Sequence, residues 1–220
     1  MSNLIEIMDP IIEVTVEKLK QKKFKSDPIA GEHFSKIVSV MSSAYKRHGF
    51  IIERAILERL KTNTNLEVWE DRSFNVPSIA DHLVDSAIES PELIFESETS
   101  YVEGPRTLQI DMIVYNKINK QISAYEIKRG NGLHDSGKRR SILRDLLCTQ
   151  ILLKSYGKQK GLEISSAKSY IVFYYGMCSI KKPFSLTREE LDEHFGFSVF
   201  KEVEMVNEYF RSKLFDILTE

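Results

Sequence analysis

Apolar residues recur every three or four positions along two long segments near the start of the chain, which is the spacing of one helical face. The first segment covers residues 3–23, and Pro10 predicts a break within it. The second covers residues 32–61, with His48 and Gly49 as a candidate interruption. The pattern therefore predicts an all-helical beginning. The basic run at the end of the first segment, residues 20–25, is interpreted as a solvated helix end rather than a binding site.

The middle of the chain changes to short segments rich in β-branched and aromatic residues, which are typical of strands. Such segments occupy residues 66–76, 106–116, 121–129 and 168–176. The last of them is the most apolar, as expected of a strand that is buried on both faces.

Helical spacing returns between and after these strands. Pro77 begins a predicted helix that runs to residue 88, and residues 138–157 form a stronger one that we expect to end at Gly157. The tail predicts one or two further helices, and Thr187 with Glu190 makes a capping box at the start of the first.

The order of elements is helix, strand hairpin, helix and buried strand, which predicts an α/β fold with a mixed central sheet flanked by helices. We expect three parts within one globule. Residues 1–30 form an N-terminal helical arm, residues 31–180 the core, and residues 181–220 a C-terminal helical extension.

Composition agrees with a single sizeable globular domain, because 42% of the 220 residues are hydrophobic. The 31 basic and 32 acidic residues give a net charge of -1, so only local clustering can indicate a polyanionic partner. Cys148 and Cys178 are expected to be buried free thiols. No apolar run approaches a membrane span and no signal peptide is visible, so we expect a cytoplasmic protein without a membrane partner.

Two acids and a lysine stand in the strand hairpin, where burial is otherwise expected. Alternation places Asp111 on one face of its strand, with Ile110 and Met112 on the other. Glu126 and Lys128 share a face of the next strand. If the turn is residues 117–120, Asp111 lies opposite Glu126 on the same face, and a shift by two residues sets it opposite Lys128 instead.

Opposed carboxylates destabilise a hairpin unless something neutralises them. Paired oxygen ligands are what a hard divalent cation such as Mg²⁺ prefers. Lys128 could then hold a water that the metal activates as a nucleophile. The alternative is an ordinary surface ion pair between Lys128 and one of the two acids.

With Asp111 in one strand and Glu126, Ile127 and Lys128 in the next, the hairpin resembles the PD-(D/E)XK nuclease superfamily, which includes many restriction endonucleases. The resemblance covers residues 32–176, although Ile110 replaces the proline of the motif. It implies a restriction endonuclease-like core with element order α-β-β-β-α-β.

The same resemblance implies roles for individual residues. Asp111 and Glu126 would ligate Mg²⁺, the backbone carbonyl of Ile127 would assist, and Lys128 would position the attacking water. The superfamily also tends to supply an acid from the first core helix, and here Glu53 is the first choice and Glu58 the second. The alternative for Glu53 is a solvated acid on a helix face.

Basic residues crowd the first turns of the helix after the hairpin, where phosphate contacts would lie close to the metal. They are Lys138, Arg139, Arg140 and Arg144. Ordinary solubilising charge is the alternative. Gln150 and Lys154 resemble polar positions that some members of the superfamily turn toward the site, and we include Gln150 among the predicted DNA-binding residues. A catalytic role for His134 is not favoured.

The function that these features predict is a Mg²⁺-dependent DNA endonuclease, with Mn²⁺ as a substitute metal. A homodimeric type II restriction enzyme that cuts double-stranded DNA at a specific sequence is the preferred role. The alternatives are a repair or recombination nuclease of the same fold and a non-catalytic nucleic-acid-binding module.

Overall fold

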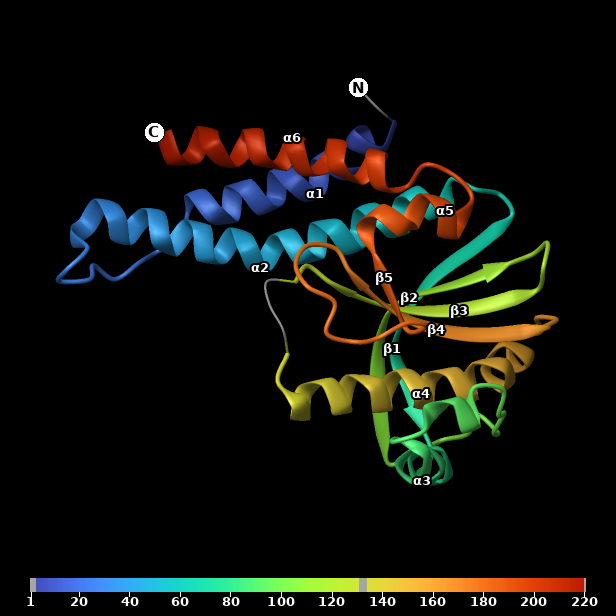
Figure 1. Cartoon of the computed structure of the whole chain (residues 1–220). Helices are drawn as coiled ribbons and strands as arrows, with labels where there is room; N and C mark the ends of the chain where they lie inside the picture. Colours follow the sequence, from blue (N-terminus) through green and yellow to red (C-terminus); the bar gives the residue numbers. More distant parts are fainter. Residues whose placement is uncertain (1–2, 131–133, 220) are drawn as a thin grey trace. The chain divides into compact units, whose positions relative to one another are not determined.

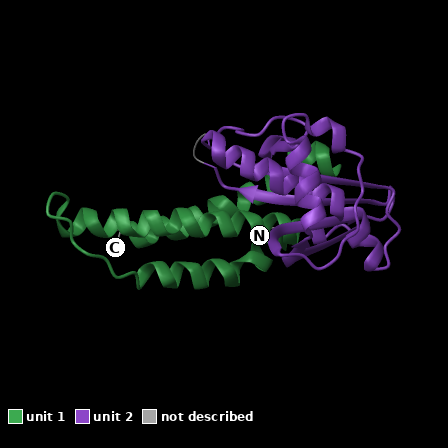
Figure 2. Cartoon of the chain, turned by 90° about the horizontal axis from the view of Figure 1, so that it is seen from below, with its two compact units in different colours: residues 1–59, 191–220 green, residues 60–190 purple. Residues whose placement is uncertain are grey.

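A computed structural model describes residues 3–130 and 134–219 and divides the chain into two units (Figures 1 and 2). Unit 1 comprises residues 1–59 and 191–220, and unit 2 comprises residues 60–190. The predicted domain limits at residues 30 and 180 do not coincide with this division and stay a prediction. Because residues 31–59 group with the two ends of the chain, most of the first predicted core helix belongs to unit 1.

Unit 1 consists of helices, as the spacing of its apolar residues predicts. They are α1 (Asn3–Lys20), α2 (Gly31–Lys61), α5 (Leu191–Phe195) and α6 (Phe200–Thr219). α1 and α6 pack side by side (Figure 1). Neither expected break occurs, because α1 continues through Pro10 and α2 continues through Gly49. Met8 and Ile12 on either side of Pro10 are fully buried, so packing compensates for the backbone hydrogen bond that proline cannot donate.

Unit 2 contains a five-stranded sheet with strand order β1-β2-β3-β4-β5. The strands are β1 (Leu66–Val76), β2 (Arg106–Asn116), β3 (Gln121–Lys128), β4 (Ser166–Phe173) and the short β5 (Ser185–Thr187). β1, β2 and β3 are antiparallel neighbours, whereas β4 and β5 run parallel to β3. This mixed sheet with flanking helices confirms the predicted α/β fold.

One helix covers a face of this sheet, and a second helix packs on the first. α4 (Ser136–Gln159) connects β3 to β4 and packs on both, while α3 (Ser78–Ala87) packs on α4 (Figure 1). Short 3₁₀ turns occupy Pro91–Ile94 and Arg188–Glu190. α4 does not end at Gly157 as expected, because Gly161 supplies the left-handed residue that follows it, with φ of 81°.

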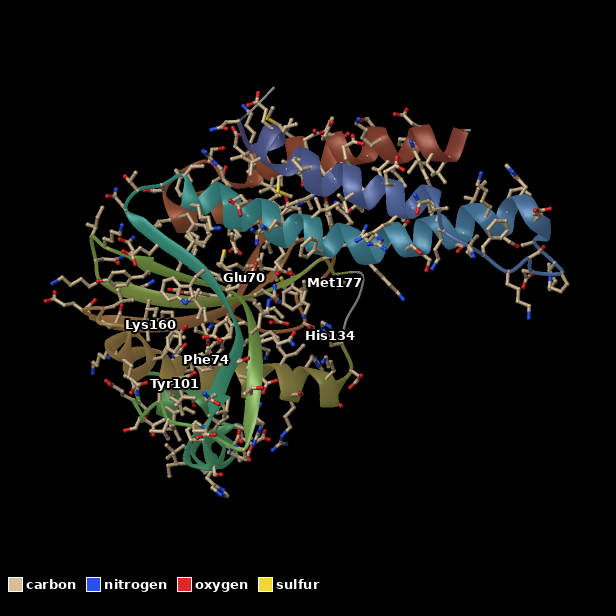
Figure 3. The ribbon with its side chains drawn as sticks, turned by 180° about the vertical axis from the view of Figure 1, so that it is seen from behind. Glu70, Phe74, Tyr101, His134, Lys160 and Met177 are labelled. Atoms are coloured by element: carbon tan, nitrogen blue, oxygen red, sulfur yellow. The ribbon has the colours of Figure 1, made fainter. Side chains whose placement is uncertain are left out.

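Three aromatic side chains of unit 2 pack against one another. Phe74 is fully buried, and its ring lies 4.9 Å from that of Tyr101 and 5.1 Å from that of Tyr156, between ring centroids (Figure 3). Tyr156 also accepts a hydrogen bond from the indole of Trp69. The cluster therefore joins β1, α4 and the segment before β2.

Of the two cysteines, Cys148 is buried as expected, but the expectation for Cys178 is wrong because it is exposed.

A network of charged side chains holds α3, α4 and β2 together. Asp81 of α3 accepts from the guanidinium of Arg106 at 2.8 Å and from that of Arg144 at 2.9 Å. Arg106 also donates to Asp145 at 2.9 Å. The hydrogen bond from Arg106 holds the pKa of Asp81 below its usual range, and burial opposes this only in part.

Asp81→Asn is expected to lower the free energy of unfolding at pH 7 by about 2 kcal/mol, because the amide loses a charge-assisted hydrogen bond. A carboxylate whose pKa is lowered by folding stabilises above its unfolded pKa of about 3.9, and that stabilisation is lost as pH falls through the folded pKa. Urea unfolding should therefore show the two proteins converging below about pH 4. Asp85→Asn is the control, because Asp85 pairs with Arg144 but is 55% exposed. A constant difference between Asp81→Asn and the natural chain across this pH range would contradict the assignment.

Candidate active site

A β-bulge in β2 places Asp111. Trp69 of β1 pairs with Ile113, and Asp71 pairs with Ile110, so β2 advances by three residues where β1 advances by two. The extra residue is the signature of a bulge, which re-aims the side chains around it. Ile110 and Ile113 both belong to the buried cluster, instead of facing opposite sides as strict alternation predicts. Asp111 and Met112 are the two residues between them.

The hairpin register agrees with the predicted turn at residues 117–120. Asn116 pairs with Gln121, and the ladder continues to Met112 with Tyr125. The alternative register, shifted by two residues, is therefore wrong. Beyond this last pair the Asp111 carboxylate accepts the backbone N–H of Ile127 at 2.8 Å. The Asp111 carboxylate thus accepts the hydrogen bond that a backbone carbonyl of β2 would accept if the ladder between β2 and β3 continued.

The electrostatics of Glu126 show that negative charge is concentrated here. Burial raises the pKa of Glu126, the charge of Asp111 raises it further, and Asp145 adds a smaller effect in the same direction. Lys128 forms an ion pair with Glu126 and lowers the pKa of that carboxyl in part. The side chains of Lys128 and Glu126 are 37% and 30% exposed. Such a site favours an added cation, which would relieve the repulsion between the carboxylates.

A cavity of about 140 Å³ opens between the β2–β3 hairpin and α4. Its lining combines apolar side chains with charged groups of both signs, and the charged groups are Glu126, Lys128, Lys138 and Asp145. Asp145 was not predicted. Asp145 follows Lys138 by seven residues, which is two helical turns. This spacing puts both side chains on the same face of the helix, and it could have indicated Asp145 from the sequence.

Comparison with models of known protein families shows which family this chain belongs to. The family model described as "Type II restriction endonuclease, HinfI" matches residues 4–212. The chain belongs to the HinfI family of type II restriction endonucleases. This family match confirms the resemblance to a restriction endonuclease that the hairpin motif indicated. No curated protein and no solved structure matches the chain.

Membership of the HinfI family implies a DNA endonuclease and therefore a hydrolase that binds DNA. Type II restriction endonucleases generally use a divalent metal. The donor set at the hairpin suits one, since Asp111 and Glu126 supply carboxylate oxygens in a partly buried site. Among the residues that the structure describes, no three acidic, histidine or cysteine side chains converge as a ready metal cluster. Backbone carbonyls, water and the substrate are further sources of oxygen ligands for such an ion.

The predicted basic residues of α4 point in different directions in this HinfI-family chain. Lys138 lines the cavity beside Lys128. Arg139 lines a separate hollow together with Lys181 and Lys182. Two others contact neighbouring acids, since Arg140 pairs with Glu89 at 3.0 Å and Arg144 pairs with Asp81 and Asp85. Lys138 is therefore the member of this group that lies nearest to the hairpin acids.

Gln150 lies in the interior of unit 2, only 5% exposed. Its amide donates to the carbonyl of Phe95 at 2.9 Å and accepts from the N–H of Ser169 at 3.2 Å. Both ends of the side chain are thus used to join α4 to its surroundings. We leave Gln150 out of the proposed DNA-binding surface for this reason.

Two further candidates lie elsewhere in the chain. Glu53 and Glu58 are half-buried residues of α2 in unit 1, and Glu58 pairs with Arg54 at 3.0 Å. The role of Glu53 stays a prediction. His134, labelled in Figure 3, shares a hydrogen bond with the hydroxyl of Ser179 at 2.7 Å.

Among the described helices of this HinfI-family chain, none is long and apolar enough to cross a membrane.

Proposed function

We propose that the chain is a Mg²⁺-dependent endonuclease that cleaves double-stranded DNA at a specific sequence. The observation that carries the proposal is the placement of Asp111 and Glu126 on adjacent strands beside Lys128, within a chain of the HinfI family. In this proposal Asp111 and Glu126 hold the metal, with the carbonyl of Ile127 as a third oxygen donor. Mn²⁺ would substitute for Mg²⁺.

The metal would act as a Lewis acid that stabilises charge on the phosphate. The protein groups supply orientation. Lys128, fixed by its ion pair with Glu126, would hold the attacking water and donate to a phosphate oxygen as negative charge develops there. The water oxygen would bond to phosphorus as the bond from phosphorus to the leaving sugar oxygen breaks. The water would release one proton to solvent, and the displaced oxygen would take up one proton from solvent.

Lys138 is proposed to contact a phosphate next to the one that is cleaved, because it lines the same cavity as Lys128. Arg139 is proposed to extend this contact along the backbone. Cutting both strands of a duplex requires two active sites or two successive events, and we propose a homodimer with one site for each strand. Glu53 is proposed as an additional acid.

Digestion of plasmid DNA with Mg²⁺, comparing the natural chain with Lys128→Ala, tests the proposal. We expect discrete bands from the natural chain and a loss of at least about 10²-fold in rate from the variant, since an electrostatic stabiliser of this kind contributes about 3 kcal/mol. Lys160→Ala, a change on the exposed surface, is the control. Smeared or nicked products would indicate a repair or less specific nuclease. If neither DNA nor RNA is cut, the non-catalytic binding module becomes the better interpretation.

A further inference from the structure

Positive charge is concentrated in one stretch of unit 1. Residues 18–47 contain eight Lys and Arg against two Asp and Glu, a net charge of +6. The remaining 190 residues contain 23 basic and 30 acidic residues, a net charge of −7. A nearly neutral chain thus carries a basic segment on an otherwise acidic protein. Such local clustering is the footprint expected of a polyanion-binding surface.

A groove of about 460 Å³ lies within this segment, between the α1–α2 connector and the first half of α2. We call it the serine–lysine groove, after the residue types that dominate its lining. It is lined by Lys22, Phe24, Lys25, Asp27, Ala30, Ser35, Val38, Ser39, Ser42, Ser43 and Lys46. All of these residues belong to unit 1, so the groove is complete within that unit.

One wall of the groove is a polar face of α2. Ser39, Ser42, Ser43 and Lys46 follow the spacing i, i+3, i+4 and i+7, which puts them on one side of the helix. Across residues 3–130 and 134–219, none of these three serine hydroxyls has a hydrogen-bond partner. Donor groups are therefore available there for an external ligand that accepts hydrogen bonds.

The lysines of the groove differ from many others on the surface. Among the described residues, no acid pairs with Lys22, Lys25 or Lys46, and all three are exposed. Elsewhere, lysines are commonly paired, for example with Glu163 at Lys120 and with Glu98 at Lys158. The groove therefore keeps its charge uncompensated.

The acid in the groove does not cancel this charge. Asp27 directs one carboxylate oxygen to the backbone N–H groups of Ile29 and Ala30, at 2.8 and 3.0 Å. Its own N–H donates to the hydroxyl of Ser35 at 2.9 Å. These bonds, with Gly31 in the left-handed region at φ of 68°, fix the connector against the start of α2. Asp27 thus shapes the groove, and the lysines line it.

We propose that the serine–lysine groove binds the sugar–phosphate backbone of DNA, in addition to the contacts around Asp111 and Glu126. The polar face from Ser39 to Lys46 is about 10 Å long at ~1.5 Å per residue. Phosphates of one strand rise by ~3.4 Å per base pair along the axis of the duplex, so this face is long enough to meet about three of them. Lysine ammonium and serine hydroxyl groups are backbone-positioning contacts without base specificity. The proposal rests on the proposed endonuclease function and revises the interpretation of residues 20–25 as a solvated helix end.

The test compares two triple variants of the full chain with the natural protein. Lys22→Gln/Lys25→Gln/Lys46→Gln neutralises the groove, and Lys117→Gln/Lys160→Gln/Lys201→Gln removes the same charge from exposed positions elsewhere. Anisotropy of a fluorescein-labelled duplex, without Mg²⁺ so that it is not cut, gives Kd over a range of NaCl concentrations. Circular dichroism checks that both variants are folded, and light scattering gives their mass.

We expect the groove variant to reduce the slope of log Kd against log salt by about 2 to 3 for each groove that contacts the duplex, and by about twice that if both grooves of a homodimer do so, since each lost phosphate contact contributes about 0.9. The control triple should change the slope by less than about 1. Equal slopes for the two triples, with DNA binding and cleavage intact in the natural chain, would overturn the groove alone. Absence of DNA binding by the natural chain would overturn the endonuclease proposal as well. A halved mass for the groove variant with an unchanged slope would show that the groove binds a second copy, and would also overturn the proposal.

Discussion

Asp111→Asn is expected to reduce DNA cleavage by at least about 10³-fold while leaving the fold intact. Its carboxylate is one of two acids on the hairpin, and loss of its charge removes an oxygen donor suited to a divalent cation. A 10³-fold loss corresponds to about 4 kcal/mol of transition-state stabilisation, the scale of a metal contribution. Single-turnover cleavage of a plasmid with saturating enzyme measures the effect without interference from DNA affinity.

Asparagine is the informative replacement because its side-chain oxygen can still accept the N–H of Ile127, which Asp111 accepts at 2.8 Å. A structural role for that hydrogen bond is therefore preserved while the charge is lost. Glu163→Gln is the matched control, since Glu163 pairs with Lys120 at the turn end of the hairpin. Calorimetric titration with Mn²⁺ gives a second readout, and we expect weaker binding by Asp111→Asn. Unchanged cleavage and unchanged Mn²⁺ affinity would refute the assignment of Asp111 as a metal ligand.

Gly104→Ala is expected to lower the free energy of unfolding by at least about 3 kcal/mol, the upper range for a side chain forced into occupied space. A Cβ atom at this position would lie 2.1 Å from the carbonyl oxygen of Val76 and 2.6 Å from the nitrogen of Pro77. Both are backbone atoms, which cannot rotate away as a side chain can. Guanidinium denaturation followed by circular dichroism measures the loss.

Gly161→Ala is the appropriate comparison for this change. A Cβ atom there meets nothing within 4 Å, and only the left-handed backbone at φ of 81° disfavours alanine. We expect a loss of about 1 kcal/mol from that conformational cost. Similar losses for the two variants would mean that the segment before β2 can move away from Val76, contrary to the close approach in the structure.

The register of the hairpin was predictable because it depends on local features. The turn at residues 117–120 and the burial of the flanking strands together allow few pairings, and the observed pairing of Asn116 with Gln121 is the one that a four-residue turn predicts. The bulge at Asp111 was not predictable in the same way. It arises where β2 pairs with β1, and β1 lies some forty residues earlier in the chain.

Other differences between the predicted and the observed structure also arise from contacts between distant segments of the chain. Pro10 does not end α1, because α6 from the other end of the chain packs against that helix. Asp145 was not predicted because it belongs to α4, outside the hairpin motif, and reaches the cavity only through the packing of α4 on the sheet. The sequence thus indicated the residues of the motif and Lys138, but not Asp145, which lines the same cavity as Lys138.

The bulge has a consequence for how this enzyme can change during evolution. Side chains of a strand alternate with a period of two, so one extra residue reverses the orientation of everything on one side of it. A one-residue insertion or deletion between Leu108 and Ile113 would therefore exchange buried and outward side chains along half of β2. The length of this short stretch should be as strictly preserved among relatives as the identity of its acid.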